Sequence, residues 1–100
     1  MIDEASVWRA LASVMDPEIP YSVVDLGLVY GVALPAPGRV KVQLTLTTRG
    51  CPLVRRIADD VRTAVVQTTG AAEVEVEIVW DPPWSPSMAS EAVRRQLGWA

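Results

Sequence analysis

The sequence contains no histidine and a single cysteine, Cys51, among its 100 residues. One cysteine cannot form a disulfide within the chain. Without histidine the chain cannot assemble by itself the Cys–His or Ser–His–Asp arrangement that activates the nucleophile of many hydrolases. These absences exclude many hydrolytic mechanisms and direct attention to the thiol of Cys51.

Basic residues are also scarce: nine lysines and arginines stand against twelve acidic residues, for a net charge of −3 and a pI near 4.8. Nucleic-acid binding normally needs a positive surface, so we do not expect it. The N-terminus lacks the basic and apolar regions of a secretory signal, and no apolar run reaches membrane-spanning length. We therefore expect a cytoplasmic protein without membrane contact. Half of the residues are hydrophobic, which at this length predicts a single domain over residues 1–100.

The first half of the chain predicts a helix followed by two strands. Asp3 can cap a helix that Asp16-Pro17 ends at about Met15. Its apolar residues recur at helical spacing: Val7, Leu11 and Val14. A strand is expected over residues 28–34, a turn over 35–38 and a half-buried strand over 39–47. The alternation assigns one buried face to Val40, Val42, Leu44 and Leu46, and one exposed face to Arg39, Lys41, Gln43, Thr45 and Thr47.

The second half predicts a helix, a strand and a short helix. The first of these follows Pro52 and ends near Gly70, with an apolar stripe formed by Leu53, Ile57, Val61, Ala64 and Val65. Alternation over residues 73–80 predicts a third strand that buries Val74, Val76 and Ile78 and exposes Glu73, Glu75 and Glu77. Ser90 can cap a last helix that carries Val93 and Leu97.

The resulting order, helix-strand-strand-helix-strand-helix, predicts an α+β domain of two layers, with helices on one face of a small sheet. A right-handed crossover through the second helix would make the third strand parallel to the second. The pattern leaves open which neighbour the third strand pairs with. Cys51 then lies past the end of a strand and at the start of a helix, where ligands commonly bind in such sheets.

Two interpretations of Cys51 follow from this position. A helix start has unpaired N–H groups and a partial positive charge, both of which favour a thiolate, and Arg49 adds positive charge beside it. Pro52 suits the first position of a helix. The alternative is a small, inert side chain that fills the core. The residues alone leave both interpretations open.

Several oxygen-bearing side chains are candidates for a site around this cysteine. Thr47 and Thr48 can offer hydroxyl groups to a ligand or to the sulfur, although threonine is also ordinary at strand ends and turns. Asp16, Glu18 and Asp25 can bind a hard cation or act as an acid or base, although capping and turn formation explain them as well. Convergence of these groups on the cysteine would favour the functional interpretation.

Tryptophan is concentrated in the last quarter of the chain, where Trp80, Trp84 and Trp99 stand among prolines. Tryptophan is enriched among interface anchors. It packs equally well against a domain's own sheet. Both roles remain open for these three side chains.

Four blocks of sequence together resemble the SufT-type iron–sulfur assembly factors, relatives of the eukaryotic cytosolic targeting subunit and of PaaD-like proteins. The blocks are Asp16-Pro17-Glu18-Ile19-Pro20, residues 24–30, residues 45–53 and residues 80–86. The resemblance covers nearly the whole chain. Two departures are evident: Arg49 stands where that family more often has proline, and the cysteine-bearing C-terminal extension of PaaD proteins is absent. The second departure argues against an orthodox PaaD role.

The resemblance implies an α+β domain that acts in the maturation of iron–sulfur proteins as an assembly factor and not as an enzyme. It implies that Cys51 is the reactive, cluster-linked or metal-ligating residue, with a pocket formed by Thr47, Thr48, Asp16, Glu18 and Asp25. The implied partners are the iron–sulfur assembly machinery and client apoproteins.

A cluster ordinarily takes about four thiolate ligands, and this chain offers one. We therefore expect a labile iron–sulfur cluster or iron that is shared with a second copy in a homodimer, a small thiol or the client, and that is not tightly bound. Three alternatives stay open. They are a metal-free adaptor that docks clients through Trp84 and Trp99, a PaaD-like oxygenase maturation factor, and a redox enzyme that depends on an external thiol.

Overall fold

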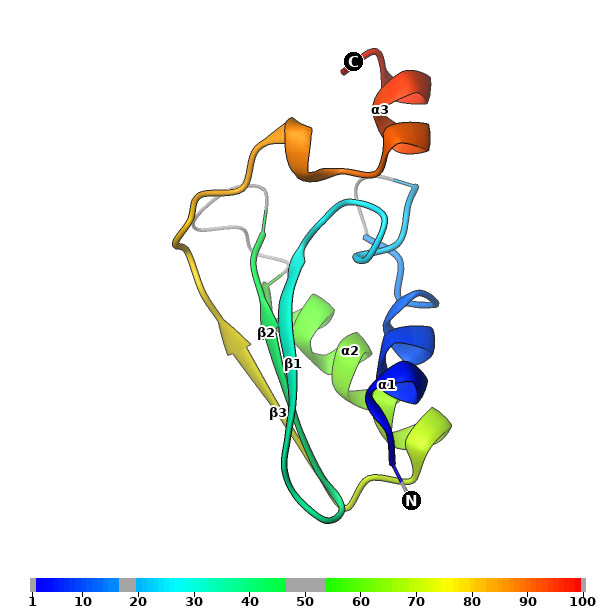
Figure 1. Ribbon diagram of the computed structural model, residues 1–100, viewed down its shortest axis with the longest axis vertical. Helices are drawn as coiled ribbons and strands as arrows, with labels where there is room; N and C mark the ends of the chain where they lie inside the picture. The colour runs from blue at the N-terminus through cyan, green and yellow to red at the C-terminus, as the bar shows by residue number, and fades with distance from the viewer. Residues whose placement is uncertain (1, 17–19, 47–53, 100) are drawn as a thin grey trace.

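The computed structural model describes residues 2–16, 20–46 and 54–99, and its elements follow the predicted order. They are helix α1 (Glu4–Leu11), strands β1 (Val29–Ala36) and β2 (Arg39–Leu44), helix α2 (Val54–Thr69), strand β3 (Glu73–Ile78), a 3-10 helix (Pro86–Met88) and helix α3 (Glu91–Leu97). Figure 1 shows α1 and α2 together on one side of the sheet, which confirms the two-layer α+β prediction. None of the helices in the described ranges is long and apolar enough to cross a membrane.

Strand β2 is the centre of a sheet with the order β1-β2-β3. It pairs antiparallel with β1 across the turn at Pro37-Gly38, and parallel with β3, where Val42 lies opposite Val76. The expected parallel direction of the third strand is thus confirmed, and the partner that the sequence left open is β2. Helix α2 forms the crossover between the two parallel strands.

The two faces of the sheet differ in chemistry. Val40, Val42 and Leu44 of β2 are buried, as their alternation predicted. Val74 of β3 is also buried, whereas Val76 and Ile78 are only partly covered. The opposite face carries ion pairs between β2 and β3: Arg39 with Glu73, and Lys41 with Glu75 and Glu77.

Helix α1 begins as predicted but ends earlier. The Asp3 carboxylate accepts a hydrogen bond from the Ser6 amide at 2.8 Å, which caps the first turn. The helix ends at Leu11, so the predicted end near Met15 is wrong. The amide of Val14 bonds three residues back to Leu11, which tightens the last turn, and Met15 then pairs with Ser22 in a short bridge.

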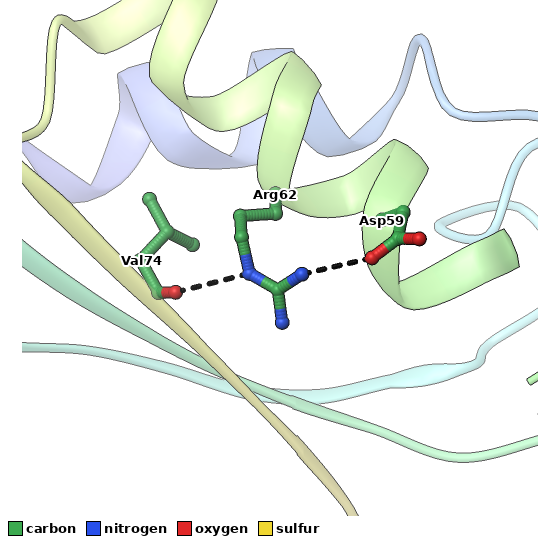
Figure 2. Close-up of polar contacts among 3 residues, drawn as sticks. All are labelled: Asp59, Arg62 and Val74. Carbon is green, nitrogen blue, oxygen red and sulfur yellow. Dashed lines mark hydrogen bonds and ion pairs between the residues drawn. The ribbon is translucent and has the colours of Figure 1, made fainter. Parts of the chain in front are cut away.

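Helix α2 packs on the sheet through Ile57, Val61 and Val65, which are all buried. Arg62 also ties the helix to β3. Figure 2 shows its Nε donating to the Val74 carbonyl at 3.4 Å, while its Nη1 lies 2.9 Å from Asp59 Oδ1. The helix ends where Gly70 donates its amide to the Val66 carbonyl, as the sequence indicated.

Helix α3 lies beyond the end of the sheet and not on its face (Figure 1). The Ser90 hydroxyl accepts a hydrogen bond from the Val93 amide, which confirms the predicted cap, and Val93 is buried. The Tyr21 hydroxyl donates to the side chain of Gln96. Helix α3 therefore contacts the segment that joins α1 to β1.

Candidate functional site

The carboxyl end of β2 is held on both sides by segments from elsewhere in the chain. The Thr45 amide donates to the Leu28 carbonyl at 2.8 Å, and the Val79 amide donates to the Leu44 carbonyl at 2.9 Å. Leu46, the last described residue before the cysteine-bearing segment, is 4% exposed. That segment therefore starts from a fixed and buried point.

Thr45 departs from the predicted alternation. It was expected on the exposed face of its strand, but it is completely buried. Its Oγ1 has no hydrogen-bond partner among the residues that the structure describes. A buried hydroxyl that lacks a partner costs about 1–3 kcal/mol, and replacing Thr45 by valine tests whether this one does.

Asp25 lies in the turn that reaches the end of β2. We call residues 22–28 the Asp25 loop. Its amides bond within the loop: Asp25 to the Ser22 hydroxyl at 3.0 Å and Gly27 to the Val24 carbonyl at 3.0 Å. Leu28 ends the loop and accepts the bond from Thr45 described above. Asp25 is exposed. It lies three residues before Leu28, which contacts the carboxyl end of β2 directly.

Asp16 lies at the other border of the cysteine-bearing segment. It donates its amide to the Tyr21 carbonyl at 3.0 Å and lines a groove of about 490 Å³. The opposite wall of the groove includes Arg56 and Asp60 from the first turns of α2. Asp16 is therefore near the helix that follows the cysteine, while Asp25 is near the strand that precedes it.

The remaining candidates lie outside the described residues: Thr47, Thr48, Arg49, Cys51 and Glu18. Their convergence on one pocket stays a prediction. Within the ranges 2–16, 20–46 and 54–99, no three carboxylate, cysteine or histidine side chains are grouped closely enough to hold a metal ion.

The described first turn of α2 is basic. Arg55 and Arg56 follow directly after Val54, and this turn contains no acidic residue. The Nε of Arg56 lies 3.9 Å from Oδ2 of Asp60, so these two side chains form an ion pair. Two guanidinium groups therefore add to the positive end of the helix dipole four and five residues after Cys51. Such surroundings favour the thiolate form of a cysteine.

The tryptophan-rich segment packs against the Asp25 loop. Trp84 Nε1 donates to the Leu26 carbonyl at 2.7 Å, and its ring meets that of Trp99 edge to face, with centroids 5.9 Å apart. Trp80 also packs against the core. These three side chains are partly buried, so packing within the domain accounts for them, as one of the two interpretations held.

No pattern in the sequence indicates the burial of Thr45, because alternation predicts an exposed side chain at this position. A signal for the Asp25 loop did exist in Gly27. Its φ is 73°, and a side chain there would place Cβ 2.2 Å from the Met88 carbonyl oxygen. Asp followed two residues later by Gly is typical of a tight turn, so the Asp25-Leu26-Gly27 run could have indicated this one.

Comparison with known proteins shows the family to which the chain belongs. Residues 4–78 match the family described as iron–sulfur cluster assembly protein. A Staphylococcus aureus protein named Fe-S protein maturation auxiliary factor SufT is 41% identical over 85 residues, which are 85% of this chain and 97% of that protein. The predicted resemblance to SufT-type factors is thereby confirmed.

A longer relative and a solved structure extend the comparison. The iron-sulfur cluster carrier protein of Synechocystis is 36% identical over 88 residues, covering 88% of this chain and 25% of the carrier. The crystal structure of a domain of unknown function, DUF59, from Bacillus anthracis aligns with a TM-score of 0.90 at 34% identity, covering 97% of this chain and 92% of that one. The same small α+β fold is thus present in both chains.

Proposed function

We propose that the chain, which belongs to the iron–sulfur cluster assembly protein family and is an accessory factor in iron–sulfur protein maturation, works through the thiol of Cys51. In this proposal Cys51 binds iron or a labile iron–sulfur cluster transiently and passes it to a client apoprotein. The chain then acts as a transfer factor in the cytoplasm and not as an enzyme.

One observation carries this proposal: the cysteine-bearing segment joins the buried carboxyl end of β2 to the basic first turn of α2. In this proposal the thiolate of Cys51 is stabilised by the dipole of α2 and by Arg55 and Arg56 in its first turn. Asp25 belongs to the loop whose Leu28 carbonyl is bonded to the strand end, and Asp16 lines a groove together with Arg56 of α2. Carboxylates suit ferrous iron as additional ligands, which supports their assignment to the pocket together with Thr47, Thr48 and Glu18.

The single cysteine also explains why a carried cluster would leave readily. A cluster normally takes about four thiolates, so the remaining ligands come from a second copy of the chain, a small thiol or the client itself. A shared cluster can exchange its ligands one at a time with the recipient. The iron-sulfur cluster carrier protein among the relatives supports the assignment of this cargo.

The test is anaerobic reconstitution of the whole protein with ferrous iron and sulfide, with Cys51→Ala and Cys51→Ser as variants. We expect the wild type to gain the absorption of an iron–sulfur chromophore, with the signal falling by about tenfold or more in Cys51→Ala because no other thiolate is available. Cells that carry Cys51→Ala should show lower activity of an iron–sulfur enzyme under iron limitation. Equal enzyme activity in both strains would remove Cys51 from the mechanism.

A metal-free adaptor is the second candidate, and one observation favours it. Met15 is 51% exposed beside the groove between the end of α1 and helix α2. Methionine is flexible and is common at surfaces that bind several partners. If Met15→Glu abolishes maturation of the client while Cys51→Ala does not, the adaptor is the correct function.

A further inference from the structure

The motif Trp80-Asp81-Pro82-Pro83-Trp84-Ser85-Pro86 has no role in the function proposed so far. It belongs to a segment, residues 79–90, that leaves β3 and crosses the end of the sheet toward α3; we call it the C-terminal strap. Figure 1 shows the strap, in orange, passing over the turn that precedes β1. Its prolines cannot continue the strand, so the chain must turn away from the sheet here.

Hydrogen bonds tie the strap to the Asp25 loop at two places. Trp84 Nε1 donates to the Leu26 carbonyl at 2.7 Å, and the Ser90 amide donates to the Asp25 carbonyl at 2.8 Å. The two contacts hold successive residues of the loop. The loop is therefore fixed by its backbone, which leaves the Asp25 carboxylate available at the surface.

A steric contact and a third hydrogen bond complete the attachment. Gly27 packs so closely beneath Met88 that any side chain would meet the Met88 carbonyl. The Tyr30 hydroxyl donates to the Pro82 carbonyl at 2.7 Å, which joins the strap to β1. The ring of Trp99 packs against that of Trp84 and covers the far side of the anchor.

The attachment continues to the end of β2. The Asp25 loop ends at Leu28, whose carbonyl accepts the amide of Thr45 at 2.8 Å. A contiguous set of contacts thus runs from Trp84 through Leu26 and Leu28 to Thr45, two residues before Thr47. Movement at Trp84 would reach the point where the cysteine-bearing segment leaves the sheet.

We propose that the C-terminal strap is a clamp for the Cys51 site and that Trp84 is its positioning residue. The proposal rests on the function assigned to Cys51 above. Trp84 does not touch the cargo: its indole N–H fixes the Asp25 loop against the carboxyl end of β2. Both the ring and the N–H of Trp84 take part in this attachment.

The test compares Trp84→Phe with Trp8→Phe in the full-length protein. Both variants keep an aromatic ring and lose one indole N–H. Trp8 Nε1 bonds only to the Glu4 carboxylate on the exposed face of α1, at 3.3 Å, far along the chain from the strap. Thr69→Val serves as a control for lost stability, because it removes the bond from Thr69 Oγ1 to Val65 at the opposite end of the domain.

Two readouts are independent of iron. We expect the Thr45 amide to exchange with deuterium about fivefold faster in Trp84→Phe. This is the increase in the local opening equilibrium when one ordinary hydrogen bond is lost. Alkylation of Cys51 by a neutral reagent in the iron-free protein should rise by about threefold or more, because the loop beside the segment opens. Trp8→Phe and Thr69→Val should change neither rate to this extent.

The third readout is the lifetime of the chromophore after anaerobic reconstitution with ferrous iron and sulfide, which should shorten in Trp84→Phe alone. The clamp is refuted if the exchange and alkylation rates of Trp84→Phe equal those of Trp8→Phe. It is also refuted if these rates rise only as much as the loss of unfolding free energy explains, with Thr69→Val as the reference. Should Trp84→Phe fail to fold, Tyr30→Phe removes the bonds from the Tyr30 hydroxyl to the Pro82 carbonyl and to the Met88 sulfur, both in the strap, and is judged by the same criteria. Failure of the Cys51 function is separate: it is seen as normal client maturation in Cys51→Ala.

Discussion

The two ends of the sheet are closed in different ways. At the end of the β1–β2 turn, the amides of Ala72 and Glu73 both donate to the Gly38 carbonyl, and Arg39 pairs with Glu73 at 3.0 Å. At the opposite end, the closure depends on the C-terminal strap, leaves the Thr45 hydroxyl without a partner in the described structure, and exposes Asp25. The polar groups named at the first end are paired, whereas the second end has a buried hydroxyl without a partner in the described structure, close in sequence to the predicted site.

The largest contrast is expected from adding a methyl group at each end. Gly27 and Gly38 have nearly the same φ, 73° and 76°, so Gly27→Ala and Gly38→Ala share the strain of a left-handed residue, about 1–2 kcal/mol. The Cβ of Gly27→Ala would also lie 2.2 Å from the Met88 carbonyl oxygen, whereas that of Gly38→Ala would lie 3.7 Å from Ala72 Cβ. Overpacking of this kind adds about 1–3 kcal/mol.

Urea unfolding of both alanine variants measures the difference. Gly27→Ala should lose roughly 3 kcal/mol of unfolding free energy and Gly38→Ala roughly 1 kcal/mol. Equal losses would show that the strap yields freely at Met88 and does not hold the Asp25 loop.

Smaller individual effects, of opposite sign, are expected from two threonines. Thr69→Val removes a hydroxyl that donates to the Val65 carbonyl, and should destabilise the protein by about 1 kcal/mol. Thr45→Val removes a buried hydroxyl that lacks a partner among the described residues, and should stabilise it by about 1 kcal/mol. Thermal and urea unfolding check both signs. A destabilised Thr45→Val would mean that its hydroxyl is already satisfied, for example by a buried water.

The smallest effect is expected on the charged face of the sheet. The hydrogen bond and charge of Lys41 lower the pKa of Glu77 from its ordinary 4.5, and the same pair raises the pKa of Lys41. Because the folded-state pKa of Glu77 is depressed, its stabilisation is present above about pH 4.5 and is lost as the pH falls through the lowered pKa.

Glu77→Gln tests this dependence. The variant should be slightly less stable than the wild type at neutral pH, and the difference should vanish at an acidic pH below the lowered pKa of Glu77, where the wild-type carboxyl is protonated. Urea midpoints of the two proteins at both pH values give the measurement. A difference that stays constant with pH would assign it to packing and not to charge.

Local rules predicted much of the fold. Asp3 and Ser90 were identified as caps because capping depends on residues within one turn. The buried face of β2 followed from the alternation of its side chains. The early end of α1 was missed because the bridge between Met15 and Ser22, a tertiary constraint, overrides helical spacing.

The candidate site was less predictable from the sequence. The positions of Asp16 and Asp25 at the two borders of the cysteine-bearing segment depend on contacts with α2 and with the strap, which no local pattern encodes. Thr45 was assigned to the wrong face because alternation carries no information about segments that cover a strand end. The placement of Cys51 itself stays a prediction.

Arg62 has a consequence for how this domain behaves among other chains. Strand β3 is at the margin of the described sheet, and such a strand can recruit a strand from another molecule and begin aggregation. The guanidinium of Arg62 already occupies the Val74 carbonyl and is itself held by Asp59. An incoming strand could bond to the Val74 carbonyl only by displacing the Arg62 guanidinium. The margin of the sheet formed by β3 is in this way less open to unselective strand pairing.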